Sequence, residues 1–170
     1  MMAVKGMRSE IVVVQHTVAG DSIFSGGIAG IVGGALLMSF AIGTSVMNGG
    51  DILSPFRLAG ATFIGPAAMN GGTAIILYGA LVYLVTSIVW GILFAAILPR
   101  DASPGSAFVA GLVYGLVVML IMSYAVLPLV NPVMRSAVEG TTSFTMEHLI
   151  YGGSLALVPM LRRRFTTQGE

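Results

Sequence analysis

Charged side chains are scarce in this sequence of 170 residues, which has eight basic and seven acidic residues. A soluble domain carries about 25% charged residues, so these few charges are too sparse to cover a water-facing surface. No charge falls between residues 21 and 51, between 57 and 100, or between 101 and 135. Each gap exceeds the roughly 20 apolar residues that cross the hydrocarbon core of a bilayer. The sequence therefore predicts an integral membrane protein.

Cysteine is absent altogether, which excludes disulfides, thiolate metal ligands, iron–sulfur clusters and covalently attached haem. The net charge of +1 gives no general electrostatic basis for binding nucleic acid. The sequence also lacks the motifs of nucleotide binding, of a catalytic triad and of a metal cluster, and it has no carboxylate pair inside a helix. We therefore expect no enzyme activity, no cofactor, no metal site and no nucleic-acid partner.

Apolar residues, by contrast, make up 56% of the chain, at a mean hydropathy of +0.94. Inside lipid every backbone polar group must be paired within the protein, and these runs lack the alternation of barrel strands, so we expect helices. Four crossings are predicted, at residues 23–47, 73–98, 106–130 and 144–161, which gives an all-α, four-helix integral membrane bundle. Residues 52–65 are apolar enough to lie in the headgroup layer or to re-enter the membrane, and both options stay open.

The basic residues that flank the expected helices predict the orientation of the chain. Six of them would share one side of the membrane: Lys5, Arg8, Arg100, Arg162, Arg163 and Arg164. The other side would hold Arg57 and Arg135. Because basic residues concentrate on the cytoplasmic side, we expect both termini in the cytoplasm. Residues 1–22 then form a cytoplasmic segment, residues 23–161 the transmembrane domain, and residues 162–170 a basic cytoplasmic tail.

The two halves of the expected transmembrane domain resemble each other. Residues 29–38 align without gaps with residues 110–119, although Gly, Ala, Val and Leu recur in many membrane helices. We interpret the alignment as a duplication, with residues 23–98 as repeat one and residues 104–161 as repeat two. A repeat with two crossings keeps its orientation, so the axis that relates the repeats would run along the membrane normal.

Small residues recur four positions apart in the expected helices, which places them on one helix face. Such faces let two backbones approach closely and gain dispersion and Cα–H···O contacts. They pack within the bundle or, alternatively, dock a partner subunit. The expected helix-packing residues are Gly26, Gly30, Gly34, Ala107, Gly111, Gly115, Gly152 and Ala156.

An interfacial charge cluster is expected at the outer edge of the membrane, formed by Arg57, Arg135, Glu147 and His148. A carboxylate at the hydrocarbon boundary is costly to leave unpaired, so we expect Glu147 to pair with Arg135 or Arg57. His148 would then brace the loop that carries Arg135. In the alternatives, His148 contacts a quinone or a lipid headgroup, or ligates haem.

Two motifs carry a resemblance to a known group of proteins. The run Leu127-Pro128-Leu129-Val130-Asn131-Pro132 is followed by His148-Leu149-Ile150-Tyr151-Gly152 at the start of the last expected helix. This arrangement resembles small bacterial four-helix membrane proteins of unknown function, well over the last two helices and loosely over the first half. The resemblance implies a similar architecture and a location in the bacterial inner membrane, and it implies no particular activity.

Small-residue faces, sparse polar groups and missing catalytic motifs together favour a non-catalytic accessory or structural subunit of a larger inner-membrane complex, such as one for electron transport. Its partners would be membrane lipids and other membrane-protein subunits, or further copies of itself. The main alternative is a small oligomeric transporter or channel, which requires polar side chains through the depth of the bundle. A second alternative is a subunit that contacts a quinone, a lipid or haem through His148.

The predicted orientation is testable by cysteine labelling, because the chain has no cysteine of its own. We expect Ser143→Cys to react with a membrane-impermeant thiol reagent in intact cells. Ser103→Cys should react only after the cells are opened. Labelling of Ser103→Cys in intact cells would contradict the cytoplasmic placement of the termini.

Overall fold

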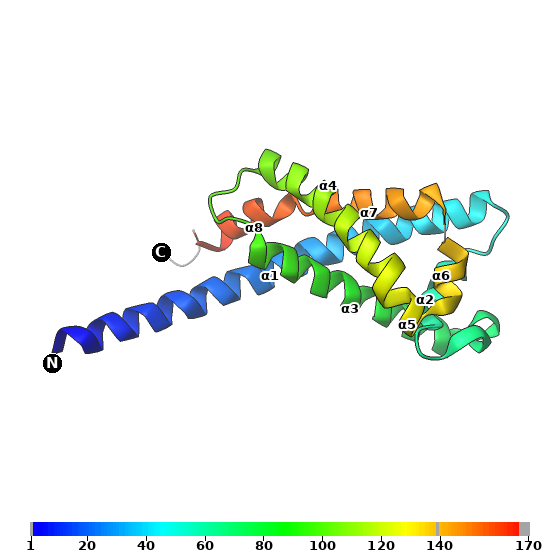
Figure 1. Cartoon of the computed structure of the whole chain (residues 1–170), viewed down its shortest axis with the longest axis horizontal. Helices are drawn as coiled ribbons and strands as arrows, with labels where there is room; N and C mark the ends of the chain where they lie inside the picture. The colour runs from blue at the N-terminus through cyan, green and yellow to red at the C-terminus, as the bar shows by residue number, and fades with distance from the viewer. Residues whose placement is uncertain (1, 139, 167–170) are drawn as a thin grey trace.

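The computed structural model describes the backbone of residues 2–138 and 140–166 and the side chains of residues 20–138 and 140–164. Every regular element in these ranges is a helix (Figure 1), so the prediction of an all-α fold is confirmed. The side chains of Lys5 and Arg8, on which the predicted orientation partly depends, lie outside the described residues. The same is true of residues 167–170 of the expected tail.

The longer helices are α1 (Met2–Met47), α3 (Thr73–Ile97), α4 (Pro104–Ile121) and α7 (Thr142–Ser154). Shorter elements complete the chain: α2 (Ser54–Gly60), the 3₁₀-helix η1 (Gly65–Asn70), the π-helical turn η2 (Met122–Val126), α5 (Leu127–Val130), α6 (Pro132–Val138) and α8 (Leu157–Thr166). α1 thus begins well before the expected residue 23, and its first part projects beyond the rest of the molecule (Figure 1).

Among the described residues, three helical segments are long and apolar enough to cross a membrane: Gly20–Met47, Thr73–Ile97 and Pro104–Val130. They correspond closely to the first three of the four expected crossings. Their length and composition support a membrane protein. The fourth expected crossing has a different form.

Residues 144–161 do not form the continuous helix that we expected, because α7 ends at Ser154 and α8 begins at Leu157. Pro159 explains the interruption. Its ring nitrogen carries no N–H, and the ring clashes with the carbonyl of the residue four positions earlier, Leu155. α8 therefore begins just before Pro159, where a proline in the first turn loses no hydrogen bond.

A similar effect interrupts the third expected crossing at η2. Pro128, in the first turn of α5, cannot donate to Tyr124 four positions earlier. A π-helical turn is one way in which a helix accommodates such a loss. The chain consequently stays helical through Pro128 as far as Val130, with a local change of pitch.

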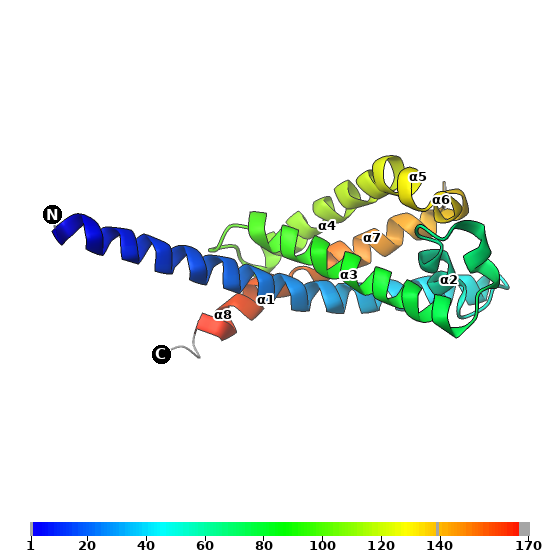
Figure 2. The ribbon, with the colours of Figure 1, turned by 90° about the horizontal axis from the view of Figure 1, so that it is seen from below.

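α1 lies between α3 and α7, and α7 lies between α1 and α4 (Figures 1 and 2). The consecutive helices α3 and α4 meet mainly at one crossing. There the Tyr114 ring centroid lies 5.1 Å from that of Phe94 and 6.3 Å from that of Trp90. From this crossing the two helices separate toward the end of the bundle that holds α2 and α5 (Figure 2).

Glycines bring two helix pairs into backbone contact. A Cβ added to Gly30 on α1 would overlap the carbonyl oxygen of Ser87 on α3. In the α4–α7 pair, a Cβ added to Gly111 would overlap the carbonyl oxygen of Gly152, and the reverse is also true. Helix backbones approach this closely only where the side chains between them are very small.

The other expected packing residues fall into three groups: Gly26, Gly34 and Gly115 face the backbone or side chain of a neighbouring helix, Ala107 is fully buried, and Ala156 lies in the break between α7 and α8. Ala156 therefore does not extend the face of Gly152 along one helix. The expected packing residues other than Ala156 lie where α1 packs against α3 and where α4 packs against α7.

The connection between α1 and α3 folds back onto the first turns of α3. Gly79 permits this approach, because a Cβ there would overlap the carbonyl oxygen of Phe56 on α2. The Tyr78 hydroxyl donates a hydrogen bond to the Thr62 carbonyl at 3.1 Å. α2 and the turn after it are therefore packed against the bundle.

Arg162, which we expected in a solvated tail, ties the opposite end together. The residue is 8% exposed, and its guanidinium donates to the carbonyls of Leu98, at 3.2 Å, and Ala95. A cation in this position also complements the negative C-terminal end of α3. An ion pair at 3.5 Å between Arg100 and Asp21 adds a link between the α3–α4 connection and α1.

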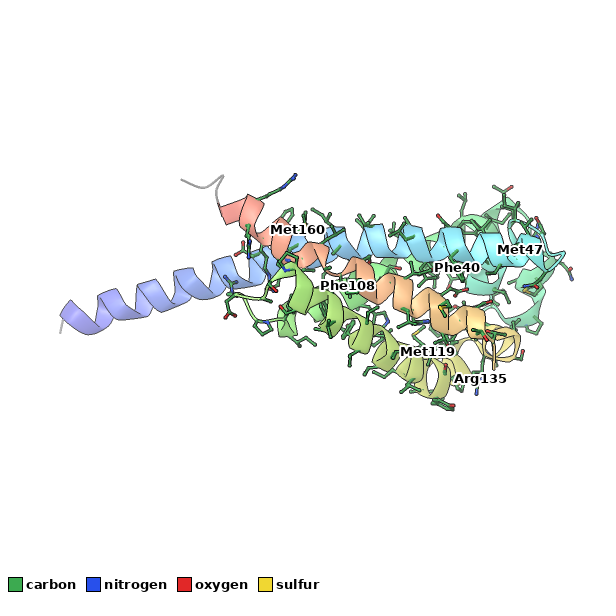
Figure 3. The ribbon with its side chains drawn as sticks, turned by 90° about the horizontal axis from the view of Figure 1, so that it is seen from above. Phe40, Met47, Phe108, Met119, Arg135 and Met160 are labelled. Carbon is green, nitrogen blue, oxygen red and sulfur yellow. The ribbon has the colours of Figure 1, made fainter. Side chains whose placement is uncertain are left out.

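The outer surface of the bundle is apolar along its length. Large apolar side chains are exposed on several helices, among them Phe108 on α4 and Met160 on α8 (Figure 3). Arg135 lies instead at the end of the bundle formed by α6 (Figure 3). Such an apolar belt matches the surface that a protein presents to hydrocarbon.

The glycine contact between α1 and α3 gives a stability prediction. Gly30→Leu places a side chain against the backbone of α3 and should cost ~1–3 kcal/mol or more through overpacking. Gly27→Leu is the matched control, because a Cβ at Gly27 meets nothing within 4 Å. We expect unfolding by titrated sodium dodecyl sulfate to shift for Gly30→Leu and not for Gly27→Leu. Equal shifts would show that α1 and α3 are not in backbone contact.

Candidate functional site

A cavity of about 310 Å³ lies between α3, α4 and α7. Its end away from the α3–α4 crossing is closed by Ala59 and Thr62 from the α2 region, together with Met134 of α6. Val85 and Val89 of α3 also line the cavity, and their side chains are 50% and 47% exposed. Because both residues lie within an expected crossing, the cavity opens sideways, toward the lipid.

The cavity follows from how α3 and α4 are held. The Tyr114 hydroxyl donates to the Trp90 carbonyl at 2.8 Å, which fixes the two helices at their crossing. Beyond the crossing, α3 packs on α1 while α4 packs on α7, so the two helices diverge. Trp90 lines the end of the cavity next to the crossing.

Asn131, from the Leu127–Pro132 motif, holds together the segments at the other end of the cavity. It is fully buried, and its Nδ2 donates to the Leu58 carbonyl at 2.7 Å and to Thr62 Oγ1 at 3.0 Å. Its Oδ1 accepts the Met134 N–H at 2.9 Å, which caps the start of α6. Asn131 thereby fastens the corner between α5 and α6 to the α2 region.

Two polar residues of α7 face this largely apolar cavity, Glu147 and His148. His148 is 7% exposed, and its Nδ1 lies 2.8 Å from the carbonyl oxygen of Phe144. The rings of His148 and Phe144 meet edge to face at 4.4 Å. His148 is therefore oriented by its own helix. We had expected it to brace the loop that carries Arg135, and it does not.

Glu147 is partly buried and lines the cavity. Neither ion pair identified among the described residues includes it. Arg57, one of its expected partners, pairs instead with Asp51, and Arg57 Nε donates to the Gly71 carbonyl at 3.3 Å. Leu53 N–H and Arg57 hold the pKa of Asp51 below its ordinary value.

Arg135, the other expected partner of Glu147, has its guanidinium carbon 5.6 Å from the centroid of the Tyr124 ring. This is the geometry of a cation–π contact. The structure thus separates the expected charge cluster into three places. Arg57 lies on α2, Arg135 on α6, and Glu147 and His148 together line the cavity.

Tyr83 adds a polar group that the sequence did not single out. Its ring lines the cavity, and its hydroxyl is buried without a hydrogen-bond partner among the described residues. The Tyr151 hydroxyl, on the α7 side of the cavity, is satisfied, since it donates to the Ser87 carbonyl at 2.6 Å. Neither hydropathy nor spacing distinguishes these two tyrosines, because the difference lies in which carbonyl each can reach.

Several hydroxyls that a channel would need are used within their own helices. Ser39 donates to Ala35 at 2.7 Å, and Thr86 donates to Val82 at 2.8 Å. In both residues the hydroxyl hydrogen is therefore used within the helix. Within the described part of the chain, no three His, Asp or Glu side chains come together as metal ligands would.

Comparisons of this chain with models of protein families, with curated proteins and with solved structures found no match. The resemblance to small bacterial four-helix membrane proteins therefore stays a prediction. The cavity and its polar wall are the features from which a function can be argued.

The unpartnered hydroxyl of Tyr83 gives a second stability prediction. Leaving such a group buried costs ~1–3 kcal/mol, so Tyr83→Phe should stabilise the protein by about 1 kcal/mol. Tyr151→Phe removes a hydroxyl that is hydrogen-bonded and should destabilise it by about 1 kcal/mol. Thermal unfolding of both variants in one detergent gives the comparison. Equal destabilisation by the two substitutions would mean that the Tyr83 hydroxyl has a partner in the folded protein.

Proposed function

We propose that this protein binds an amphiphile from the bilayer, with its apolar body in the cavity between α3 and α4 and a hydrogen-bonding head near Tyr83, Glu147 and His148. The observation that supports this most is the combination of a sideways opening at Val85 and Val89 with the polar side chains of Tyr83, Glu147 and His148 on a wall that is mostly apolar. Apolar pockets with a few convergent polar groups are typical of ligand sites.

The polar wall disfavours an anionic head. Glu147 is the acidic side chain on this wall, and Arg57 is engaged with Asp51 outside the cavity. An anion would therefore meet an acidic side chain at Glu147 rather than a cationic partner. Phosphate or carboxylate headgroups fit this wall less well than uncharged heads.

The membrane placement follows from the predicted orientation. With both termini in the cytoplasm, the end that holds α2 and α6 faces outward, so the cavity runs from the outer side of the bilayer past the middle of α3. Amphiphiles of the outer leaflet would reach it by lateral diffusion. The proposed role is one of binding and needs no catalytic group.

The prediction of an accessory subunit in an inner-membrane complex stays a prediction, as does that of an oligomeric transporter. The exposed apolar belt suits a partner subunit as well as lipid. An amphiphile bound at the lipid-facing opening would be compatible with either assembly. The cavity nevertheless makes binding the more specific proposal.

Trp90 provides the test, because it lines the cavity and is the only tryptophan in the sequence. Dibrominated stearyl alcohol, added to the protein in phosphatidylcholine vesicles, should quench Trp90 fluorescence in a saturable manner, since bromine quenches at short range. Val126→Phe narrows the cavity at η2 and should abolish the saturable part. Val113→Phe, at an exposed valine of α4 outside the cavity, should retain it.

Quenching that rises in proportion to the probe, with no saturation and no difference between the two variants, would contradict the proposed function. That pattern is what lipid at an ordinary protein surface produces. Circular dichroism of each variant establishes that its helices are intact.

A further inference from the structure

The hydrogen-bonding pattern of His148 restricts the chemistry of the head. We infer that the ligand carries a hydroxyl whose O–H donates to His148 Nε2, an inference that rests on the proposed function. Long-chain alcohols, acylglycerols with a free hydroxyl, and phenolic or quinol amphiphiles share this chemistry. Ketones, quinones and ethers, which only accept hydrogen bonds, lack it.

The first step concerns the proton on the imidazole ring. Nδ1 of His148 lies 2.8 Å from the Phe144 carbonyl oxygen. A carbonyl oxygen can only accept a hydrogen bond, so Nδ1 must carry the hydrogen. In the neutral ring, Nε2 then has a lone pair and is an acceptor. Nε2 of His148 can thus form a hydrogen bond only with a group that donates a hydrogen.

The second step concerns what can donate to Nε2. Among the described residues, no side chain or backbone N–H is hydrogen-bonded to it, while His148 as a whole is 7% exposed and lines the cavity. An acceptor that faces an apolar space without a donor is destabilising. A ligand that supplies an O–H therefore gains an interaction that a purely accepting head cannot make.

The third step concerns Tyr83 on the facing wall. Its hydroxyl is buried and unpartnered, and an O–H group can donate as well as accept. A ligand hydroxyl can accept from Tyr83 through its oxygen while it donates to His148 through its hydrogen. An ether or carbonyl oxygen satisfies Tyr83 alone. The pair of side chains thus selects a head that does both.

The experiment compares two probes that differ only in the donated hydrogen. Dibrominated stearyl alcohol and its methyl ether are titrated separately into vesicles that contain the protein, and quenching of Trp90 is followed. We expect the alcohol to half-saturate at about a tenfold lower concentration than the ether, as one buried hydrogen bond of ~1.4 kcal/mol requires.

Two substitutions at His148 place amide groups at different points of the former ring. In His148→Asn the amide lies near the position of Nδ1, so the bond to Phe144 can persist while the Nε2 acceptor is lost. In His148→Gln the amide lies near the position of Nε2, where its oxygen can accept. We expect the preference for the alcohol to vanish in His148→Asn and to persist in His148→Gln.

The outcomes separate this inference from the proposed function. Saturable quenching by both probes at equal concentrations would overturn the hydroxyl inference and leave amphiphile binding in place. Absence of saturation for both probes would overturn the proposed function itself. A preference that persists in His148→Asn would overturn the role of Nε2. The wild-type ratio of the two probes is decisive even if one variant fails to fold.

Discussion

Backbone contact within two helix pairs is the constraint on which the rest of the structure depends. α1 meets α3 at Gly30, and α4 meets α7 at Gly111 and Gly152, where no side chain separates the backbones. Lipid is as apolar as the helix surfaces, so close packing and weak polar contacts must hold such pairs together. Each pair is consequently tight, and the molecule is assembled from the two pairs through α1 and α7.

This assembly explains why a cavity exists where it does. α3 and α4 belong to different pairs and share one crossing, which the Tyr114 hydrogen bond to Trp90 fixes. Away from the crossing each helix follows its own partner, and the space between them widens. The two tight pairs coincide with the halves of the predicted duplication, which stays a prediction. The cavity lies on the seam between them.

The polar groups of the bundle obey one rule with few exceptions. Inside lipid a hydroxyl or amide needs a partner within the protein, and Tyr78, Tyr114 and Tyr151 each donate to a carbonyl of another segment. Tyr83 breaks the rule among the described residues. The exception lies on the cavity wall, together with Glu147 and His148. An unpartnered hydroxyl beside a carboxyl and an imidazole, all around one apolar space, is what a binding site for an amphiphile requires.

The sequence by itself determined the helices, because hydropathy and the chemistry of proline act locally. The expected helix at residues 73–98 differs from α3 by one residue. The interruptions at Pro128 and Pro159 follow from their missing N–H groups, although we had expected continuous helices there. The spacing of glycines likewise marked Gly30 and Gly111 as residues that permit close approach.

Only the tertiary structure decided the site. The sequence led us to expect Glu147 beside Arg57 or Arg135, but Arg57 pairs with Asp51, and Glu147 on α7 lines the cavity. Whether the Tyr83 hydroxyl finds a hydrogen-bond partner depends on which carbonyls the neighbouring helices bring within reach. Which nitrogen of His148 can accept a hydrogen bond depends on the contact that its Nδ1 makes with the Phe144 carbonyl. The sequence alone shows which polar side chains cost free energy when they are buried in lipid. Their neighbours, and therefore their chemistry, are set by the packing of helices that are distant in the chain.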